Sequence, residues 1–398
     1  MSNDIDKSPE IRSYEHIYRK EPDGVSFCPY RVCPIGAHSD HNLGKVTGFA
    51  IDRGIGIAYG KKNNGVIELN SLQFDKRAQW HISSVPDRRQ NDWADYLRGA
   101  TLSFAEKHPL HAGLSGVING SLPIGGLSSS AAVIIAFLKA LYTVNGIDPE
   151  PDELINAALK AETDYVGVSV GKLDQSCEVY CKRDHLLYLD TLDGSFELIP
   201  ASPVMKPWEI MIFFSGIERT LAGSKYNMRV DEAKSAAYAL KAFAGMEYGK
   251  FGDTHLREVP FDVYEENKSR LPENWRKRAE HWYTEFDRVE KGARAWRRGD
   301  IDAFGRLSFE SGASSISKWE TGSPELKTLY DIMTETDGIY GGRFSGAGFK
   351  GCCMALVDPA FEESIEREVT ERYLAAFPEL RGRFSVHVCH SADGVGKV

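Results

Sequence analysis

The chain has 398 residues, of which 42% are hydrophobic and 26% are charged. These values are typical of folded globular proteins, and the length fits two packed domains or one large elaborated one. The formal net charge of -9 argues against a general nucleic-acid binder, because such binding depends on a basic face that neutralises phosphates.

The N-terminal region and the cysteines predict a cytoplasmic protein without a membrane segment. Residues 1–16 have neither the basic start nor the apolar run of a secretory signal. The most apolar stretch, residues 131–142, is too short to span a bilayer and contains Lys139. The seven cysteines are odd in number and lack zinc-knuckle spacing, so we interpret them as buried reduced thiols.

The first half of the chain alternates strand-like and helix-like segments, which predicts mixed α/β architecture. Residues 47–60 and 65–69 are β-rich. A long apolar helix is expected from about Ser129 to Val144, closed by an Asn-Gly pair. A second helix is expected over residues 148–165, with Asp148 as its cap and Pro149 at its first position.

In the second half, short apolar strands are expected at residues 210–215 and 352–357, and an alanine-rich helix at 229–244. Residues 272–298 form a charged helical stretch whose alternating signs indicate a solvated face. Three prolines cluster between residues 200 and 207. This cluster suggests a boundary between domains at 1–203 and 204–398.

The most specific local signal is the small-residue loop at 122–132, which leads directly into the first apolar helix. Gly125 and Gly126 let the backbone approach a ligand, and the serines from Ser128 to Ser130 can cap the helix. Unpaired N–H groups and the helix dipole would then converge where a phosphate could bind. The alternative is a serine-capped helix after a simple glycine turn.

Three motifs resemble those of the GHMP kinases, the family of galactokinase, homoserine kinase, mevalonate kinase and phosphomevalonate kinase. The run PIGGLSSSAA resembles their second motif, residues 31–42 resemble the galactokinase signature, and residues 346–357 resemble the third motif. Further matches lie at 171–175, 219–226 and 297–307. The resemblance implies a two-lobed α/β (α+β) fold. Its N-terminal lobe would resemble the second domain of ribosomal protein S5, its C-terminal lobe would be ferredoxin-like, and the active site would lie in the cleft.

The resemblance further implies an ATP-dependent, magnesium-dependent sugar 1-kinase that phosphorylates the anomeric hydroxyl of a galactose-like sugar. Asp174 matches the catalytic aspartate that orients or deprotonates this hydroxyl, and Arg31 matches its partner arginine. The metal ligands correspond to Ser130 and Glu162, with Ser129 as a near substitute.

The remaining site residues are also carried over from the motifs. The implied ATP-binding residues are Pro123, Gly125, Gly126, Leu127, Ser128, Ser129, Ser130, Ala131, Gly346, Ala347 and Gly348. The implied sugar-binding residues are Ala37, His38, Asp40, Gly171, Lys172, Asp174 and Tyr226.

One departure from the family bears on the substrate. Galactokinases carry a glutamate that accepts a hydrogen bond from the sugar's C6 hydroxyl, and this chain has Ala37 there. A glutamate about 4 Å from a C6 carboxylate would oppose it by roughly 4 kcal/mol at an effective dielectric near 20. Its loss, with Lys172, Lys45 and His41 as new cationic or titratable groups, favours galacturonic acid as substrate. Lys172 is the first candidate to meet the carboxylate.

The signature run as a whole also resembles the galacturonokinases, a group related to galactokinases. Two alternatives stay open. One is an ordinary galactokinase in which water meets the C6 hydroxyl. The other is a catalytically silent, sugar-sensing relative, although such relatives lose motif residues that this chain retains. The expected partner is thus a small-molecule substrate, either a sugar or a uronic acid. We expect no binding to nucleic acids or membranes. The sequence does not fix the oligomeric state, and a monomer is one possibility.

Overall fold

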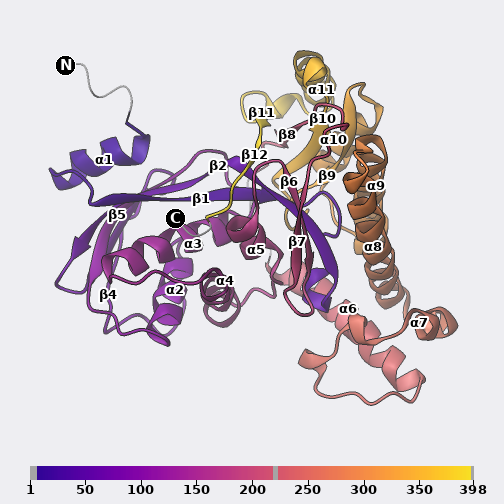
Figure 1. The fold of residues 1–398 in the computed structure, drawn as a ribbon, viewed down its shortest axis with the longest axis horizontal. Helices are drawn as coiled ribbons and strands as arrows, with labels where there is room; N and C mark the ends of the chain where they lie inside the picture. Colours follow the sequence, from indigo (N-terminus) through magenta and orange to yellow (C-terminus); the bar gives the residue numbers. More distant parts are fainter. Residues whose placement is uncertain (1–6, 218–222, 396–398) are drawn as a thin grey trace.

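The computed structural model describes residues 7–217 and 223–395. It contains two β-sheets with helices packed on them, in two lobes (Figure 1). The predicted mixed α/β class and the two-lobed arrangement are confirmed.

The first lobe is built on an eight-stranded sheet in the order β4-β3-β5-β2-β6-β7, with β1 and β12 also paired to β2. Its strands are β1 (Gly24–Val32), β2 (Lys45–Lys62), β3 (Val66–Ser71), β4 (Ala78–His81), β5 (Gly113–Gly120), β6 (His185–Asp190), β7 (Phe196–Pro200) and β12 (Ser391–Ala392). The long β2 runs through the sheet, pairing first with β6 and then with β1 and β5. Because β12 comes from the C-terminal end of the chain, the second half returns to the first lobe. The division at residues 203 and 204 stays a prediction.

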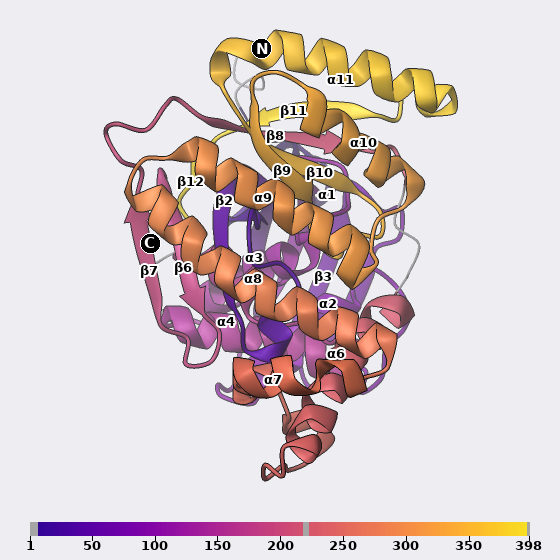
Figure 2. The same cartoon turned by 90° about the vertical axis from the view of Figure 1, so that its right-hand side faces the viewer.

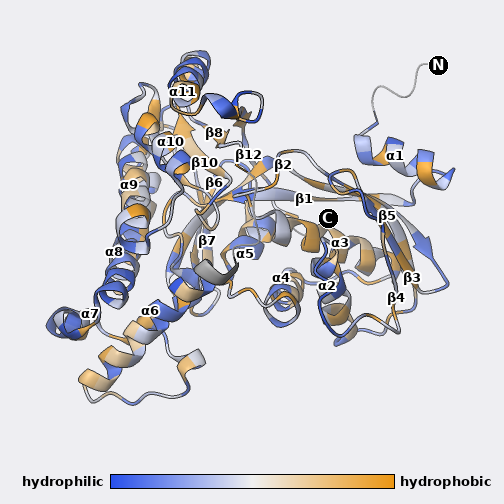
Figure 3. Cartoon of the chain, turned by 180° about the vertical axis from the view of Figure 1, so that it is seen from behind, coloured by the Kyte–Doolittle hydropathy of each residue, from blue (hydrophilic) through white to orange (hydrophobic). Residues whose placement is uncertain are grey.

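The helices of this lobe are α1 (Pro9–Tyr18), α2 (Asp95–Ala105), α3 (Ser129–Val144), α4 (Pro151–Lys160) and α5 (Leu173–Tyr180). The apolar α3 packs against β1 and β2 and stands out in the hydropathy colouring (Figure 3). Its bounds confirm the predicted helix. The next helix begins at Pro151, after an extended Glu150, and not at Pro149 as expected. A residue before proline is biased away from the helical region, so Glu150 ends the extended approach and Pro151 starts the helix.

The second lobe has a four-stranded antiparallel sheet in the order β11-β8-β10-β9. Its strands are β8 (Glu209–Phe214), β9 (Ile339–Phe344), β10 (Cys352–Val357) and β11 (Ser385–Cys389). Its helices are α6 (Gly223–Phe243), α7 (Phe261–Asn267), α8 (Glu273–Arg297), α9 (Ile301–Ser314), α10 (Pro324–Glu335) and α11 (Glu362–Ala376).

The central strands β8 and β10 of this sheet are buried on both faces, which explains their uninterrupted apolar sequences. Along β10, Cys352, Met354 and Leu356 join the core shared with the first lobe. Cys353, Ala355 and Val357 face a separate core formed with α10 and α11. The central strands therefore tie the two lobes together through one face.

Helix α8 differs from its prediction. Most of it is hydrophilic (Figure 3), yet one face is buried against the rest of the molecule, including Arg278, His281 and Glu285. The expectation that its charges only form a solvated face is therefore wrong for this stripe. The Ser311 hydroxyl of α9 and the backbone N–H of Gly36, in the loop before β2, bind Glu285 of this face. These partners cannot be identified from the helix's own sequence.

Among the described residues, no helix is long and apolar enough to cross a membrane. All seven cysteines are buried and free, as the sequence predicted.

Candidate active site

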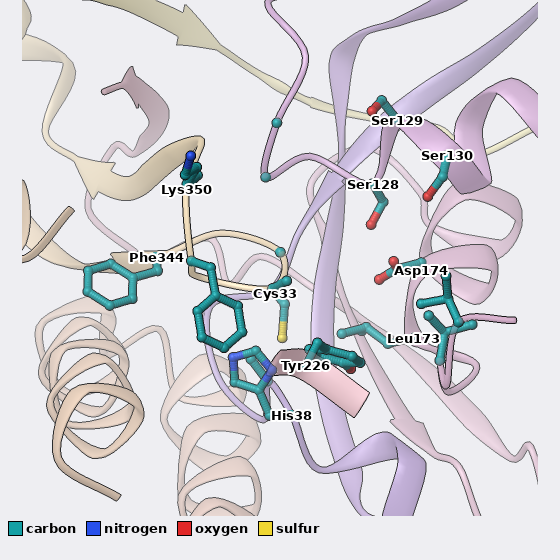
Figure 4. A pocket seen from close by; sticks show the side chains of 18 of the residues that line it. Cys33, His38, Ser128, Ser129, Ser130, Leu173, Asp174, Tyr226, Phe344 and Lys350 are labelled. Atoms are coloured by element: carbon teal, nitrogen blue, oxygen red, sulfur yellow. The ribbon is translucent and has the colours of Figure 1, made fainter. Parts of the chain in front are cut away.

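A cavity of about 570 Å³ lies where the lobes meet, and its walls come from segments far apart in the chain. They include the end of β1, loop 36–44, the glycine-serine loop at 122–130 with the start of α3, the start of α5 with the segment before it, the start of α6, the start of α10, and the β9–β10 loop. Figure 4 shows the serines and Asp174 at one end of this space and His38, Cys33 and Tyr226 at the other.

The glycine-serine loop adopts a backbone conformation that depends on its two glycines. Gly125 and Gly126 have φ of 140° and 90°, a region that other residues rarely adopt. A Cβ on Gly125 would lie 3.1 Å from the Cα of Gly351, and one on Gly126 would lie 2.7 Å from the Sγ of Cys352. The β9–β10 loop therefore packs directly on the glycine-serine loop, and the two predicted nucleotide motifs meet.

Ser128 precedes the first turn of α3 but does not cap it with its side chain, contrary to expectation. It has φ of 56°, in the left-handed region and not in the extended region that is typical of a capping residue. This hydroxyl is buried, has no hydrogen-bond partner within the described residues, and belongs to the cavity lining. It is thus left for a ligand, together with the N–H groups of the first helical turn.

Arg31 and Asp174 form an ion pair in the cavity. The Nε of Arg31 donates to Oδ1 of Asp174 at 2.8 Å, and its Nη1 donates to the carbonyl of Gly126 at 3.4 Å. Burial alone would lower the pKa of Arg31, but the neighbouring Asp174 outweighs this and raises it above its ordinary value. The arginine therefore holds a permanent charge between the carboxylate and the glycine-serine loop.

Asp40 anchors the other end of the cavity. Its Oδ2 accepts from the backbone N–H of Leu173 at 3.3 Å. A Cβ on Gly171 would lie only 2.3 Å from the same oxygen, so a glycine is required there for close approach. Burial tends to raise the pKa of Asp40, but the nearby His41, whose Nδ1 lies 3.8 Å from Oδ1, and the Leu173 N–H lower it overall. The carboxylate is ionised at neutral pH.

Ser130 and Glu162 both line the cavity. One Glu162 oxygen accepts from Nε2 of Gln175 at 2.6 Å, and the carboxylate is almost fully buried. No group of three or more histidine, cysteine or acidic ligands occurs in the described part of the chain. A hydroxyl and a carboxylate are hard oxygen donors that fit Mg²⁺, which takes its remaining ligands from water and phosphates.

The other predicted residues divide into two groups. Ala37, His38, Gly346, Ala347, Ser129 and Tyr226 also line the cavity. The described lining residues do not include Pro123, Leu127, Ala131, Lys172 and Gly348. All of these except Pro123 are next in sequence to a residue that lines the cavity. Residues 218–222, part of the predicted match at 219–226, lie outside the described residues.

Lys45 pairs with side chains other than the predicted site residues, because its Nζ lies 2.6 Å from Glu290 and 2.8 Å from the Tyr188 hydroxyl. Sequence reasoning also missed some lining residues, namely Tyr96, Ser323, Phe344, Phe349 and Lys350. The last two fall inside the third motif and could have been included. Tyr96 and Phe344 carry no signal in the sequence that marks them.

A fold and cavity of this kind define a GHMP kinase, a phosphotransferase that uses ATP to phosphorylate an alcohol group. Residues 95–182 match the GHMP kinases N terminal domain, and residues 293–375 match the GHMP kinases C terminal family. Residues 12–61 match the galactokinase galactose-binding signature. Within the GHMP kinases, the chain belongs to the galactokinase family of sugar kinases.

The relatives and solved structures agree with this assignment. A galacturonokinase of Arabidopsis thaliana is 36% identical, with 93% of this chain and 92% of the relative covered. A galactokinase of Roseiflexus is 32% identical, with 98% and 97% covered. The crystal structure of Lactococcus lactis galactokinase complexed with galactose superposes with a TM-score of 0.87 at 25% identity, covering 96% of this chain and 97% of the other.

Proposed function

We propose that this kinase transfers the terminal phosphate of ATP to the anomeric hydroxyl of galacturonic acid, giving the sugar 1-phosphate and ADP. The observation that supports galacturonic acid as the substrate is Ala37, a cavity-lining residue at the position where galactokinases have a glutamate. The seven free thiols are consistent with our proposal that it works in the cytoplasm.

Asp174 is proposed to face the anomeric hydroxyl. It would accept or orient the proton as the oxygen attacks the phosphorus. Its pairing with Arg31 at 2.8 Å holds the carboxylate at the cavity wall. Arg31 would also stabilise negative charge on the transferring group, because it reaches the carbonyl of Gly126 in the glycine-serine loop.

The glycine-serine loop and the packed β9–β10 loop are proposed to hold the triphosphate through backbone N–H groups and the hydroxyl of Ser128. Ser130 and Glu162 would hold Mg²⁺, with Gln175 fixing the carboxylate. The ion would neutralise charge on the phosphates.

Three observations favour a uronic acid over galactose. Ala37 places no negative charge in the cavity, so a C6 carboxylate meets no repulsion from this position. Beside it, Nε2 of His38 is buried without a partner among the described residues, which leaves a polar group for the ligand. In addition, the relative at 36% identity is named a galacturonokinase. Lys172 remains our proposed cation for the carboxylate, since the adjacent Gly171 and Leu173 line the cavity.

The test is a comparison of kcat/KM for galacturonic acid and galactose with magnesium and ATP. We expect kcat/KM for galacturonic acid to be higher by at least about a hundredfold. This factor corresponds to part of the repulsion of roughly 4 kcal/mol that a glutamate at this position would cause. A preference for galactose would support the second candidate, an ordinary galactokinase, which the galactose-binding signature favours. Absence of turnover with both sugars would support a sugar sensor.

A further inference from the structure

A buried charged network lies behind the sugar end of the cavity, in residues that the proposed chemistry does not use. Glu285 of α8 and Arg343 of β9 are both completely buried, and Arg288 pairs with the same glutamate. Burial alone would raise the pKa of Glu285, but His281, Arg288 and Arg343 lower it below its ordinary value. The carboxylate is therefore charged in the interior of the protein.

Three side chains of α8 bind the backbone of loop 36–44. Oε2 of Glu285 accepts from the N–H of Gly36 at 2.8 Å. One turn earlier, Nε2 of His281 contacts the carbonyl of Ala37 at 3.0 Å, and the indole N–H of Trp282 donates to the carbonyl of Ser39 at 3.2 Å. These residues lie on the buried face of the helix, which crosses this part of the molecule (Figure 2).

The tautomer of His281 follows from its two contacts. A carbonyl only accepts, so Nε2 carries the hydrogen and Nδ1 accepts from the Ser314 hydroxyl at 2.8 Å. Burial lowers the pKa of His281 to about 4, which keeps the ring neutral at physiological pH. In the three contacts from α8, Glu285 therefore accepts a hydrogen bond, and His281 and Trp282 each donate one.

Loop 36–44 needs external support, because its backbone is strained. Gly36 has φ of 100°, and the non-glycine residues His38 and Leu43 have φ of 65° and 59°. Non-glycine residues persist in this region only where the surrounding structure determines their conformation. Ala37, His38 and Asp40, which line the cavity, belong to this loop.

The same carboxylate is connected to the end of β9, where the strand reaches the cavity. The Ser311 hydroxyl donates to Oε2 of Glu285 at 2.9 Å, and Arg343 donates to both Ser311 and Ser315. Nε of Arg343 donates to the carbonyl of Phe344, which lines the cavity. Buried ion networks add little net stability compared with apolar packing. A role in positioning loop 36–44 and the end of β9 therefore explains the network around Glu285 better than a role in stability.

We infer that Glu285 is a positioning residue for the sugar site, and that with His281 and Trp282 it fixes the backbone of loop 36–44 so that Ala37, His38 and Asp40 face the substrate. This inference rests on the proposed function in one respect, namely that the loop contacts the sugar. None of the three side chains of α8 is itself among the described residues that line the cavity.

The experiment compares Glu285→Gln with Glu310→Gln. Both substitutions remove a carboxylate that pairs with Arg288, but the Glu310 side chain is 62% exposed, whereas that of Glu285 is buried and bonded to loop 36–44. We expect Glu285→Gln to raise KM for galacturonic acid by about tenfold or more, as for loss of a charged hydrogen bond. KM for ATP should change less than about threefold, and Glu310→Gln should resemble the wild type.

Trp282→Phe is a second variant, which removes the N–H that reaches Ser39 together with part of a buried ring. We expect a smaller increase of KM for the sugar, about threefold to tenfold, for a single neutral hydrogen bond. A purely structural role would lower the fraction of folded enzyme and so kcat, but it would leave KM of the folded fraction unchanged. Unchanged KM for the sugar in both folded variants would overturn the inference.

Amide hydrogen exchange of peptides covering 36–44 gives a readout that needs no substrate. Exchange should be faster in Glu285→Gln than in the wild type and in Glu310→Gln. Equal exchange in all three proteins would contradict the positioning role. If the wild type turned over no sugar while exchange changed as expected, the proposed function would fail and the support of the loop by Glu285 would stand.

Discussion

Restoring the missing carboxylate tests the basis of substrate choice directly. Ala37 is only 6% exposed and lines the cavity, and its carbonyl is held by His281 at 3.0 Å. The backbone therefore cannot easily turn a longer side chain away. In Ala37→Glu, the new carboxylate would lie within about 4 Å of a C6 carboxylate and oppose it by roughly 4 kcal/mol at an effective dielectric near 20.

This energy corresponds to about a thousandfold loss in kcat/KM for galacturonic acid. The hydroxyl of galactose meets no such repulsion, so activity on galactose should fall much less or increase. Ala37→Gln is the matched control, since it adds nearly the same volume without charge. We expect it to cost only the steric part, about tenfold for a tightly packed site.

The assay is steady-state ADP release with each sugar for the wild type and both variants. An equal loss in the glutamate and glutamine variants would show that size and not charge excludes the uronic acid. An equal effect of Ala37→Glu on the two sugars would refute the electrostatic reasoning.

Three further predictions concern other parts of the molecule. Asp174→Asn should reduce kcat by about a hundredfold or more, the usual contribution of a general base, while the Kd of a fluorescent ATP analogue stays unchanged; full turnover would exclude Asp174 from the chemistry. Gly171→Ala would place a Cβ 2.3 Å from Oδ2 of Asp40, so steady-state kinetics should show a higher KM for the sugar and an unaltered KM for ATP. Hydrogen bonding to Glu209 and then burial raise the pKa of Glu362 to about 7; its stabilising contribution is complete below its ordinary pKa and is lost as pH rises through 7. Tm should therefore fall less between pH 5 and pH 8 in Glu362→Gln than in the wild type, and identical falls would contradict the raised pKa of Glu362.

Elements with a strong local signal could be predicted from the sequence. The bounds of α3 and β10 coincide with the predicted apolar runs at 129–144 and 352–357, because a fully buried element leaves a continuous hydrophobic pattern. The start of α4 was harder, since two prolines lie close together and either one suits a first helical turn.

Features that depend on distant partners could not be predicted in this way. The αL conformation of Ser128, which goes with the absence of a side-chain cap, is not indicated by the serine-rich sequence around it. The burial of Glu285 depends on Gly36 and Ser311, which lie far from it in the chain. Arg31 and Asp174 are likewise brought together only by the fold. Their pairing followed from the family resemblance and not from any local pattern.

The central claim is that Asp174 and the glycine-serine loop meet in one cavity to phosphorylate C1 of galacturonic acid. Phosphorus NMR of a reaction with ATP, magnesium and galacturonic acid tests it most directly. The account predicts a new phosphate signal coupled to the anomeric proton, at a rate well above that of galactose 1-phosphate formation under the same conditions. A phosphate coupled to any other sugar proton, or faster formation of galactose 1-phosphate, would contradict the account.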